Sequence, residues 1–133
     1  MIPQVLRDAE PMRIGEALAV TSRNKWRRWL ATHHKDTKEV WLVFYKKSSR
    51  KSAITYDEAV EEALCYGWID VQKKRIDEER YGLRFTQRRR GSKWSRYNKA
   101  RGLKMLLAGR MTQAGKVLLP NDVLNRERGS IGT

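Results

Sequence analysis

Residues 55–70 read TYDEAVEEALCYGWID, and this stretch decides the fold. Thr55 is followed three residues later by Glu58, which fits a capping box: the hydroxyl and the carboxylate each satisfy a backbone donor at a helix start. Apolar residues then repeat at helical spacing, and carboxylates fill the first two turns, where the helix dipole favours them. Gly67 is a typical C-terminal stop. The pattern predicts a helix that starts near residue 56 and ends before Gly67.

The segments before this helix predict two strands with a helix between them. Residues 17–20 (ALAV) form a short apolar run that predicts a strand ending at Thr21-Ser22, a pair that suits a helix N-cap. Trp26, Trp29, Leu30 and His33 follow at the spacing of an amphipathic helix. Residues 40–45 (VWLVFY) are rich in valine and aromatics and too short for a typical helix, so they predict a buried strand.

The segments after it predict a hairpin and a long helix. Residues 69–76 and 81–86 have strand character, with a four-residue loop at 77–80. The sequence RRRG at 88–91 predicts a loop, and Ser92 is expected to cap a long helix that ends at Gly109. A further short helix is expected at 112–119, before Pro120.

These elements follow in the order β-α-β-α-β-β-α, a small α+β domain with a β-hairpin followed by a long C-terminal helix. We expect an irregular N-terminal arm at residues 1–16, the domain at 17–119 and a flexible tail at 120–133. One shared core is expected for the large apolar residues that lie on apolar stripes or runs: Trp26, Trp29, Trp41, Leu64, Trp68, Phe85, Trp94 and Leu103.

Composition narrows the class of protein. The longest apolar run has six residues, whereas a membrane-spanning helix needs about 20, so no transmembrane segment is expected. The first residues lack the apolar block of a secretory signal, which favours a cytoplasmic location. A single cysteine excludes an internal disulfide. The adjacent pair His33 and His34 lacks the spacing of metal ligands, and neither a metal nor a cofactor is expected.

Positive charge is concentrated in one part of the chain. The 133 residues hold 29 Lys and Arg against 15 Asp and Glu, a net charge of +14. Residues 73–104 alone hold 13 of these cations and 3 acids, which leaves +10. Such clustering attracts anions, and the partner could be nucleic acid, an acidic protein or an anionic envelope component. The alternative is a surface that only keeps the protein soluble.

The expected anion site lies where the basic loop enters the last long helix. A helix start presents unpaired N–H groups and partial positive charge, and Gly91 lets a ligand approach the backbone. The candidate anion-binding residues are Arg84, Arg88, Arg89, Arg90, Gly91, Ser92, Lys93 and Ser95. Interleaved aromatic rings at Tyr81, Phe85, Trp94 and Tyr97 either stack on bases or belong to the core.

Evidence for catalysis is weak. Cys65 follows an acidic helix start, where a thiolate is disfavoured, so we interpret it as a small buried hydrophobe. Asp70 is the one weak catalytic candidate. It is either a structural carboxylate paired with a nearby cation, or a group that organises an arginine such as Arg84 or Arg88 around a ligand. No glycine-rich phosphate loop and no Ser/His/Asp arrangement is visible.

Several of these motifs resemble the bacteriocin-protection, YdeI/OmpD-associated family over roughly residues 18–115. The Gly-Trp-Ile-Asp element of residues 67–70 and the downstream Trp-Ser-x-x-Asn carry most of the resemblance. Val71 and Gln87 depart from the family pattern, where a glycine and a proline are expected, so the hairpin turn geometry is expected to differ. The matching motif residues are Gly67, Trp68, Ile69, Asp70, Arg84, Phe85, Thr86, Arg88, Ser92, Trp94, Ser95 and Asn98.

The resemblance implies a role in protection against bacteriocins or in envelope stress, without an implied cofactor or catalytic residue. Together with the charge, it favours a non-catalytic binding protein that engages an anionic partner through a basic hairpin–helix face. The alternative is an enzyme that acts on a small phosphorylated or carboxylated substrate with Asp70 as acid/base. A third hypothesis is a module that binds only proteins. The sequence leaves the ligand, the pathway and the oligomeric state open.

Overall fold

A computed structural model of the chain describes residues 17–47 and 54–132, with side chains up to Glu127. The expected N-terminal arm lies outside the described residues. Three strands form an antiparallel sheet in the order β1-β3-β2. In chain order the elements are α2 (Arg23–His33), β1 (Glu39–Tyr45), α3 (Tyr56–Cys65), β2 (Trp68–Arg75), β3 (Arg80–Gln87), α4 (Arg96–Leu107), α5 (Gln113–Lys116) and α6 (Asn121–Gly132).

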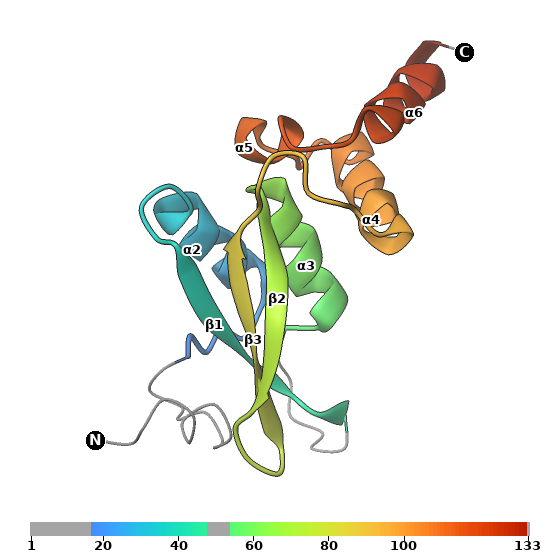
Figure 1. The fold of residues 1–133 in the computed structure, drawn as a ribbon. Coiled ribbons are helices and arrows are strands. Elements are labelled where there is room, and N and C mark those ends of the chain that lie inside the picture. Colours follow the sequence, from blue (N-terminus) through green and yellow to red (C-terminus); the bar gives the residue numbers. More distant parts are fainter. Residues whose placement is uncertain (1–16, 48–53, 133) are drawn as a thin grey trace.

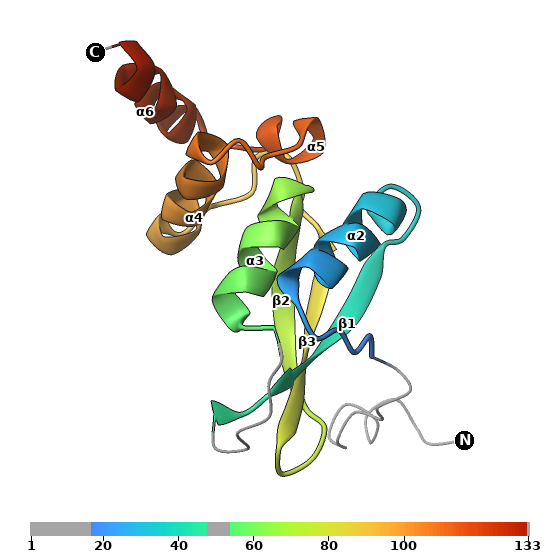
Figure 2. The ribbon, with the colours of Figure 1, turned by 180° about the vertical axis from the view of Figure 1, so that it is seen from behind.

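The helices lie on one face and at one end of the sheet. Figures 1 and 2 show α2 and α3 covering the same face, while α4, α5 and α6 gather beyond the end where β2 begins and β3 stops. No helix among the described residues covers the opposite face. The α+β class is therefore confirmed, whereas the order of elements, α-β-α-β-β-α-α-α, differs from the predicted one. Within the described residues no helix has both the length and the apolar composition to cross a membrane.

The main core fills the space between the sheet and helices α2 and α3. Trp26, Leu64, Trp68 and Phe85 are buried there, as predicted. The indole N–H of Trp26 donates to the carbonyl of Ala59 at 2.9 Å, so this buried ring has its polar atom satisfied. These contacts join α2, α3 and the hairpin into one hydrophobic unit.

The prediction of a single core was wrong for other residues. Trp41 packs with Val43 and Ile76 on the opposite face of the sheet, because side chains alternate along β1. Leu103 belongs to a separate cluster of the C-terminal helices, which is built on Leu106, Leu119 and Val123. Trp29 and Trp94 are half-buried at the margin of the main core, and Trp94 also touches the C-terminal cluster.

The predicted strand at 17–20 is reduced to one β-bridge. Leu18 pairs with Leu42 in the parallel sense, donating its N–H to Trp41 and accepting from the N–H of Val43. The chain then turns at once into α2, where the Ser22 side chain accepts from the N–H of Lys25. A nearby helix start thus leaves no room for a longer strand.

Two boundaries in the C-terminal half also differ from the prediction. The helix expected at Ser92 is α4, which begins at Arg96 with Ser95 as its N-cap, accepting from the N–H of Asn98 at 3.1 Å. Residues 121–132, predicted as a flexible tail, form α6 instead. Val123 anchors this helix, because its side chain is 2% exposed within the C-terminal cluster. The short helix expected at 112–119 is present but shorter, as α5 (Gln113–Lys116).

The stretch that decides the fold behaves as its sequence predicts. The Thr55 hydroxyl accepts from the N–H of Glu58, and the Glu58 carboxylate accepts from the N–H of Thr55, so both halves of the capping box are formed. Gly67 adopts a φ of 76°, which reverses the chain from α3 into β2. A β-carbon there would lie 2.9 Å from the carbonyl oxygen of Ala114, so the turn also packs tightly against α5.

Asp77 organises the hairpin turn and provides a first testable prediction. The guanidinium of Arg80 and the backbone N–H of Glu79 bond to its carboxylate and lower the pKa of Asp77 to about 2. Because the pKa is depressed, this interaction stabilises the turn above the ordinary carboxyl pKa and is lost as the pH falls through about 2. NMR titration of the Asp77 side chain should show this low midpoint. In Arg80→Gln the midpoint should rise, whereas in Arg84→Gln it should stay low; equal midpoints in all three proteins would contradict the assignment.

Candidate anion-binding site

A hollow of about 340 Å³ lies where the start of β2, the end of β3 and the segment after β3 meet. We call it the basic concavity. It is lined by Ile69, Asp70, Val71, Thr86, Gln87, Arg88, Arg89, Ser92 and Lys93. The lining includes three cations and one carboxylate, so its net charge is positive at neutral pH.

Backbone contacts give the concavity its shape. Val71 is a β-bulge, because the pairing with β3 shifts between Asp70 and Gln72. The N–H of Arg88 donates to the carbonyl of Gly67 at 2.7 Å, which holds the end of β3 against the turn after α3. Beyond it, a turn closes with a bond from the N–H of Ser92 to the carbonyl of Arg89 at 3.2 Å. The three segments are therefore held together by their main chains.

Arg88 is the most constrained cation of the concavity. Its guanidinium lies over the Trp94 ring, 4.0 Å from the ring centroid, and Nη2 donates to the carbonyl of Lys93. The Nε atom is buried and has no hydrogen-bond partner among the residues that the structure describes. Burial lowers the pKa of Arg88 from its ordinary value, and the charge of Asp70 opposes that effect only in part. The side chain thus carries a partly desolvated positive charge, and no carboxylate of the described residues is bonded to it.

Asp70 faces the same hollow but is held by a tyrosine. The Tyr56 hydroxyl donates to the Asp70 carboxylate at 3.0 Å, and burial together with Asp70 raises the pKa of that hydroxyl. The Arg101 guanidinium lies over the Tyr56 ring and donates to Asp57. Asp70 is therefore tied to the start of α3, and no direct Asp70–arginine hydrogen bond is formed among the described residues.

The structure brings together only part of the predicted anion-binding set. Arg88, Arg89, Ser92 and Lys93 line the concavity. Arg90 and Gly91 form its exposed turn, with Gly91 at a φ of 79°. Because α4 begins at Arg96, the start of that helix does not follow directly from the basic loop, and the Ser95 hydroxyl is already used as its cap.

Arg84 and Lys73, two cations of the hairpin, lie on opposite faces of the sheet, so the hairpin does not present all of its cations on one face. Arg84 is on the face without helices, where it donates to Gln72 at 3.1 Å and to Glu39 at 3.3 Å. Lys73 pairs with Leu83 on the helix-covered face, and its ammonium lies 4.4 Å from the centroid of the Tyr81 ring. Strand alternation separates these cations although they are close in sequence.

The aromatic residues among the cations mostly serve packing. Phe85 is fully buried, and Tyr81 stacks on Phe44 with centroids 5.5 Å apart. Trp94 is covered by Arg88, whereas Tyr97 is 62% exposed. The interpretation as core residues therefore holds for Phe85, and among these four rings only Tyr97 presents a large free surface to solvent.

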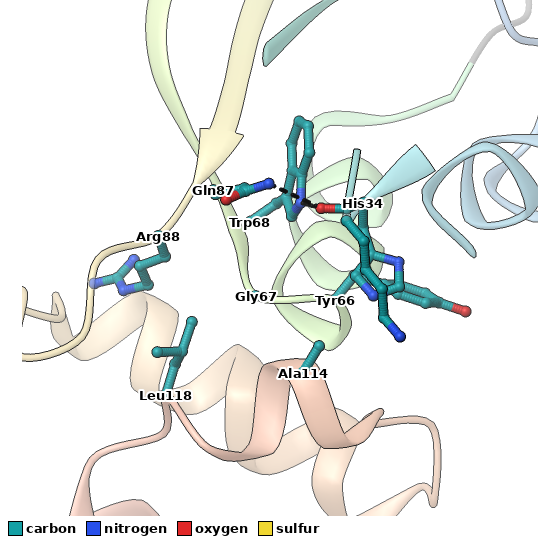
Figure 3. Close-up of a pocket in the computed structure, with 9 residues that line it drawn as sticks. His34, Tyr66, Gly67, Trp68, Gln87, Arg88, Ala114 and Leu118 are labelled. Carbon is teal, nitrogen blue, oxygen red and sulfur yellow. Dashed lines mark hydrogen bonds between the residues drawn. The ribbon is translucent and has the colours of Figure 1, made fainter. Parts of the chain in front are cut away.

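A second hollow of about 270 Å³ adjoins the concavity on the other side of Gln87 and Arg88. Figure 3 shows Arg88 and Leu118 on one side of it and His34 with Tyr66 on the other. Gln87 donates to the carbonyl of His34 at 3.0 Å and so ties the end of β3 to the end of α2. Arg88 thus borders both hollows.

Sequence reasoning missed a cluster of charges on the other side of α3. Glu62 is fully buried, although it belongs to the acidic run that we assigned to the helix dipole. Three guanidinium groups donate to its carboxylate, and a lysine and an arginine bind its neighbour Glu61. The members of this Glu–Arg cluster are Arg23, Arg27, Glu61, Glu62, Lys104 and Arg110. The sequence did contain one signal. The helix dipole acts mainly on the first helical turn, and both glutamates lie beyond that turn.

Among the described residues, no group of three or more histidine, cysteine or acidic side chains is placed to hold a metal ion. Cys65 is fully buried, and burial raises the pKa of its thiol. A thiol in this state is not a reactive nucleophile.

Comparison with protein families matches residues 18–117 to a family described as a domain of unknown function, DUF8412. The chain belongs to this family. The matched segment runs from Leu18 past the end of α5, so the DUF8412 domain includes the whole sheet, the basic concavity and the Glu–Arg cluster. Neither the curated proteins nor the solved structures contain a match to this chain.

Proposed function

We propose that this DUF8412 protein is a non-catalytic binding protein that engages an anionic partner through the basic concavity. The observation that carries the proposal is the state of Arg88, whose buried Nε lacks a partner and whose pKa is lowered by burial. A buried polar group without a hydrogen bond destabilises a protein by about 1–3 kcal/mol, more if it is charged. A phosphate or carboxylate bound in the concavity would place a negative charge beside this guanidinium.

Neighbouring side chains support the same proposal. Arg89 and Lys93 are exposed cations at the rim, and the Ser92 hydroxyl adds a neutral donor. The only carboxylate of the lining, Asp70, already accepts from Tyr56. These donors suit phosphate or carboxylate groups repeated along a polyanion, as in nucleic acid, an acidic protein or an anionic envelope component. Since the rings beside the concavity are packed, contacts to a charged backbone are favoured over base stacking.

The resemblance to the bacteriocin-protection, YdeI/OmpD-associated family extends the proposal to a biological setting. Its motif residues converge on the concavity in this chain: Gly67 binds Arg88 through the backbone, and Arg88 stacks on Trp94. Asp70 and Ser92 complete the lining. We propose that the anionic partner belongs to the response to bacteriocins, antimicrobial peptides or envelope stress.

Charge reversal at the rim tests the proposal. In the double variant Arg89→Glu/Lys93→Glu, the affinity for a fluorescent single-stranded oligonucleotide or for polyglutamate should fall at least about tenfold. For the oligonucleotide, the slope of log affinity against log salt should decrease by about 1.4 if each cation contacts one phosphate. Fluorescence anisotropy over a range of salt concentrations measures both effects.

The matched control is Lys47→Glu/Arg75→Glu, which changes the net charge equally at two exposed cations outside the concavity. It should retain most of the affinity. An equal loss in both double variants would show that the partner responds only to total charge, and the concavity would then have no special role.

The alternative function is an enzyme that acts on a small phosphorylated or carboxylated substrate. One observation favours it: Asp70 faces the concavity with its carboxylate oriented by Tyr56, beside Arg88. If the protein is such an enzyme, substrate binding would persist at raised ionic strength. A small substrate makes a few fixed contacts in the site, whereas a polyanion makes many salt-sensitive phosphate contacts. Asp70→Asn would then abolish turnover without weakening polyanion binding.

A further inference from the structure

The Glu–Arg cluster holds more positive than negative charge. Arg23, Arg27 and Arg110 all donate to the Glu62 carboxylate, with Arg27 Nη1 at 2.7 Å from Oε1. Glu61 accepts from Arg23 at 2.8 Å and from Lys104 at 2.7 Å. The six side chains thus include four cations and two carboxylates. Like charges that converge on one buried carboxylate repel one another, and an added anion would relieve that repulsion.

One member of the cluster also has an unused donor. Arg110 Nη2 donates to both oxygens of Glu62, but its Nε atom is buried and has no hydrogen-bond partner within residues 17–47 and 54–132. The backbone of Arg110 is held as well, because its carbonyl accepts from Arg27 Nη2 at 2.7 Å. Two side-chain hydrogen bonds and a main-chain contact therefore position this guanidinium before any ligand binds, which lowers the entropic cost of binding.

The cluster opens to solvent through a groove between α2 and the end of α4. Two adjoining hollows, of about 270 and 360 Å³, share Asn24 as a lining residue. The first is lined by Arg23, Glu61, Lys104, Met105, Ala108 and Arg110, and the second by Arg27, Arg28, Ala31 and Tyr66. Neither hollow shares a lining residue with the basic concavity. Arg28 is exposed and adds a further positive charge to the second hollow.

We propose that this groove binds a small phosphorylated molecule, with its phosphate at the Glu–Arg cluster and its body in the adjoining hollow. A phosphate monoester carries about two negative charges at neutral pH, which matches the excess of two cations in the cluster. Guanidinium groups donate in a fork that fits phosphate oxygens. The apolar surfaces of Met105, Ala108 and Ala31 offer contacts for an organic body. This site differs from the concavity of the proposed function in place and in ligand size.

The test is an NMR titration of the full chain with inorganic phosphate, with a nucleoside monophosphate and with the uncharged nucleoside. The two phosphates should shift the amides of residues 23–28 and 108–111 in a saturable way, and the nucleoside alone should not. Absence of these shifts up to about 10 mM ligand, which excludes a dissociation constant of about 1 mM or tighter, would overturn the proposal. So would shifts confined to residues 88–95.

Variants separate this site from the concavity. Asn24→Asp and Arg28→Glu each place negative charge in the groove at an exposed position that does not belong to the Glu–Arg cluster. Each variant should weaken phosphate binding in the groove at least about tenfold. Arg89→Glu/Lys93→Glu lies outside this groove and should leave the phosphate-dependent shifts of the amides of residues 23–28 and 108–111 unchanged. The thermal midpoint of each groove variant shows whether it is folded. If a folded groove variant binds phosphate with the same affinity as the unmodified protein, the ion binds elsewhere and the proposal is wrong. Loss of polyanion binding in the concavity variant has no bearing on this outcome.

Discussion

Gly115→Ala is expected to destabilise the protein by about 3 kcal/mol or more, because the added methyl group has no space. A β-carbon at this position would lie 2.4 Å from the carbonyl oxygen of Leu64 and 2.5 Å from that of Cys65. Both are main-chain atoms at the end of α3, so neither can move without disturbing the buried turn at Gly67. The higher helix propensity of alanine, worth about 1 kcal/mol, is too small to compensate.

The loss arises from the separation of α5 and α3. Thr112 holds them together by bonding to the carbonyl of Cys65 through its N–H at 3.0 Å and through its hydroxyl. Equilibrium unfolding in urea measures the effect, and Lys116→Ala, on the exposed side of the same helix, is the control, expected within about 0.5 kcal/mol of the unmodified protein. If Gly115→Ala cost less than about 1 kcal/mol, α5 would have to dock more loosely than the structure shows.

Local sequence patterns correctly predicted the helices and strands that are determined by interactions between residues close together in the chain. The capping box at Thr55 and Glu58 concerns atoms three residues apart, and it forms as expected. The hairpin follows from two strand-like segments with a short loop between them, and β2 and β3 pair in that way. Such features depend on spacing along the chain, which the sequence states directly.

Errors occurred where distant residues decide the outcome. The helix was expected to begin at Ser92, but Ser95 is its N-cap. Trp94 packs against both the main core and the C-terminal cluster, and the Arg88 guanidinium lies over its ring, so the helix begins only after this residue. Residues 121–132 form a helix because the side chain of Val123 is buried against Leu106 and Leu119. Neither contact is visible in a local pattern.

The candidate site likewise has features that a local sequence pattern predicts and features that it does not. Four residues of the predicted anion-binding set, Arg88, Arg89, Ser92 and Lys93, line the basic concavity. The bulge at Val71 and the unpartnered Nε of Arg88 depend on contacts between separate segments, which a local pattern does not contain. The Glu–Arg cluster joins residues 39 and 48 positions apart, from Arg23 to Glu62 and from Glu62 to Arg110. The position of Glu62 in the second helical turn indicates that the helix dipole is not its partner, but the arginines that bind it are too distant in sequence for a local pattern to identify them.

Glu62→Ala is expected to lower the free energy of unfolding by about 3–5 kcal/mol at neutral pH, because removal of one partner from a buried ion pair leaves the others uncompensated. Three guanidinium groups would face one another without the carboxylate that now accepts from each of them. Thermal and urea unfolding measure the loss. The control is Asp57→Asn, which breaks the ion pair of the 69% exposed Asp57 with Arg101 and should cost at most about 1 kcal/mol.

The same carboxylate gives the protein a defined response to acid. Burial alone would raise the pKa of Glu62, but hydrogen bonds from Arg27, Arg23 and Arg110 outweigh burial and hold it below its ordinary value. The stabilisation from Glu62 is therefore fully present above the ordinary carboxyl pKa and is lost as the pH falls through the lower folded-state value. The difference in unfolding free energy between the unmodified protein and Glu62→Gln should accordingly shrink from neutral pH to about pH 3. A difference that stayed constant or grew on acidification would mean that the arginines do not stabilise the charged form of Glu62.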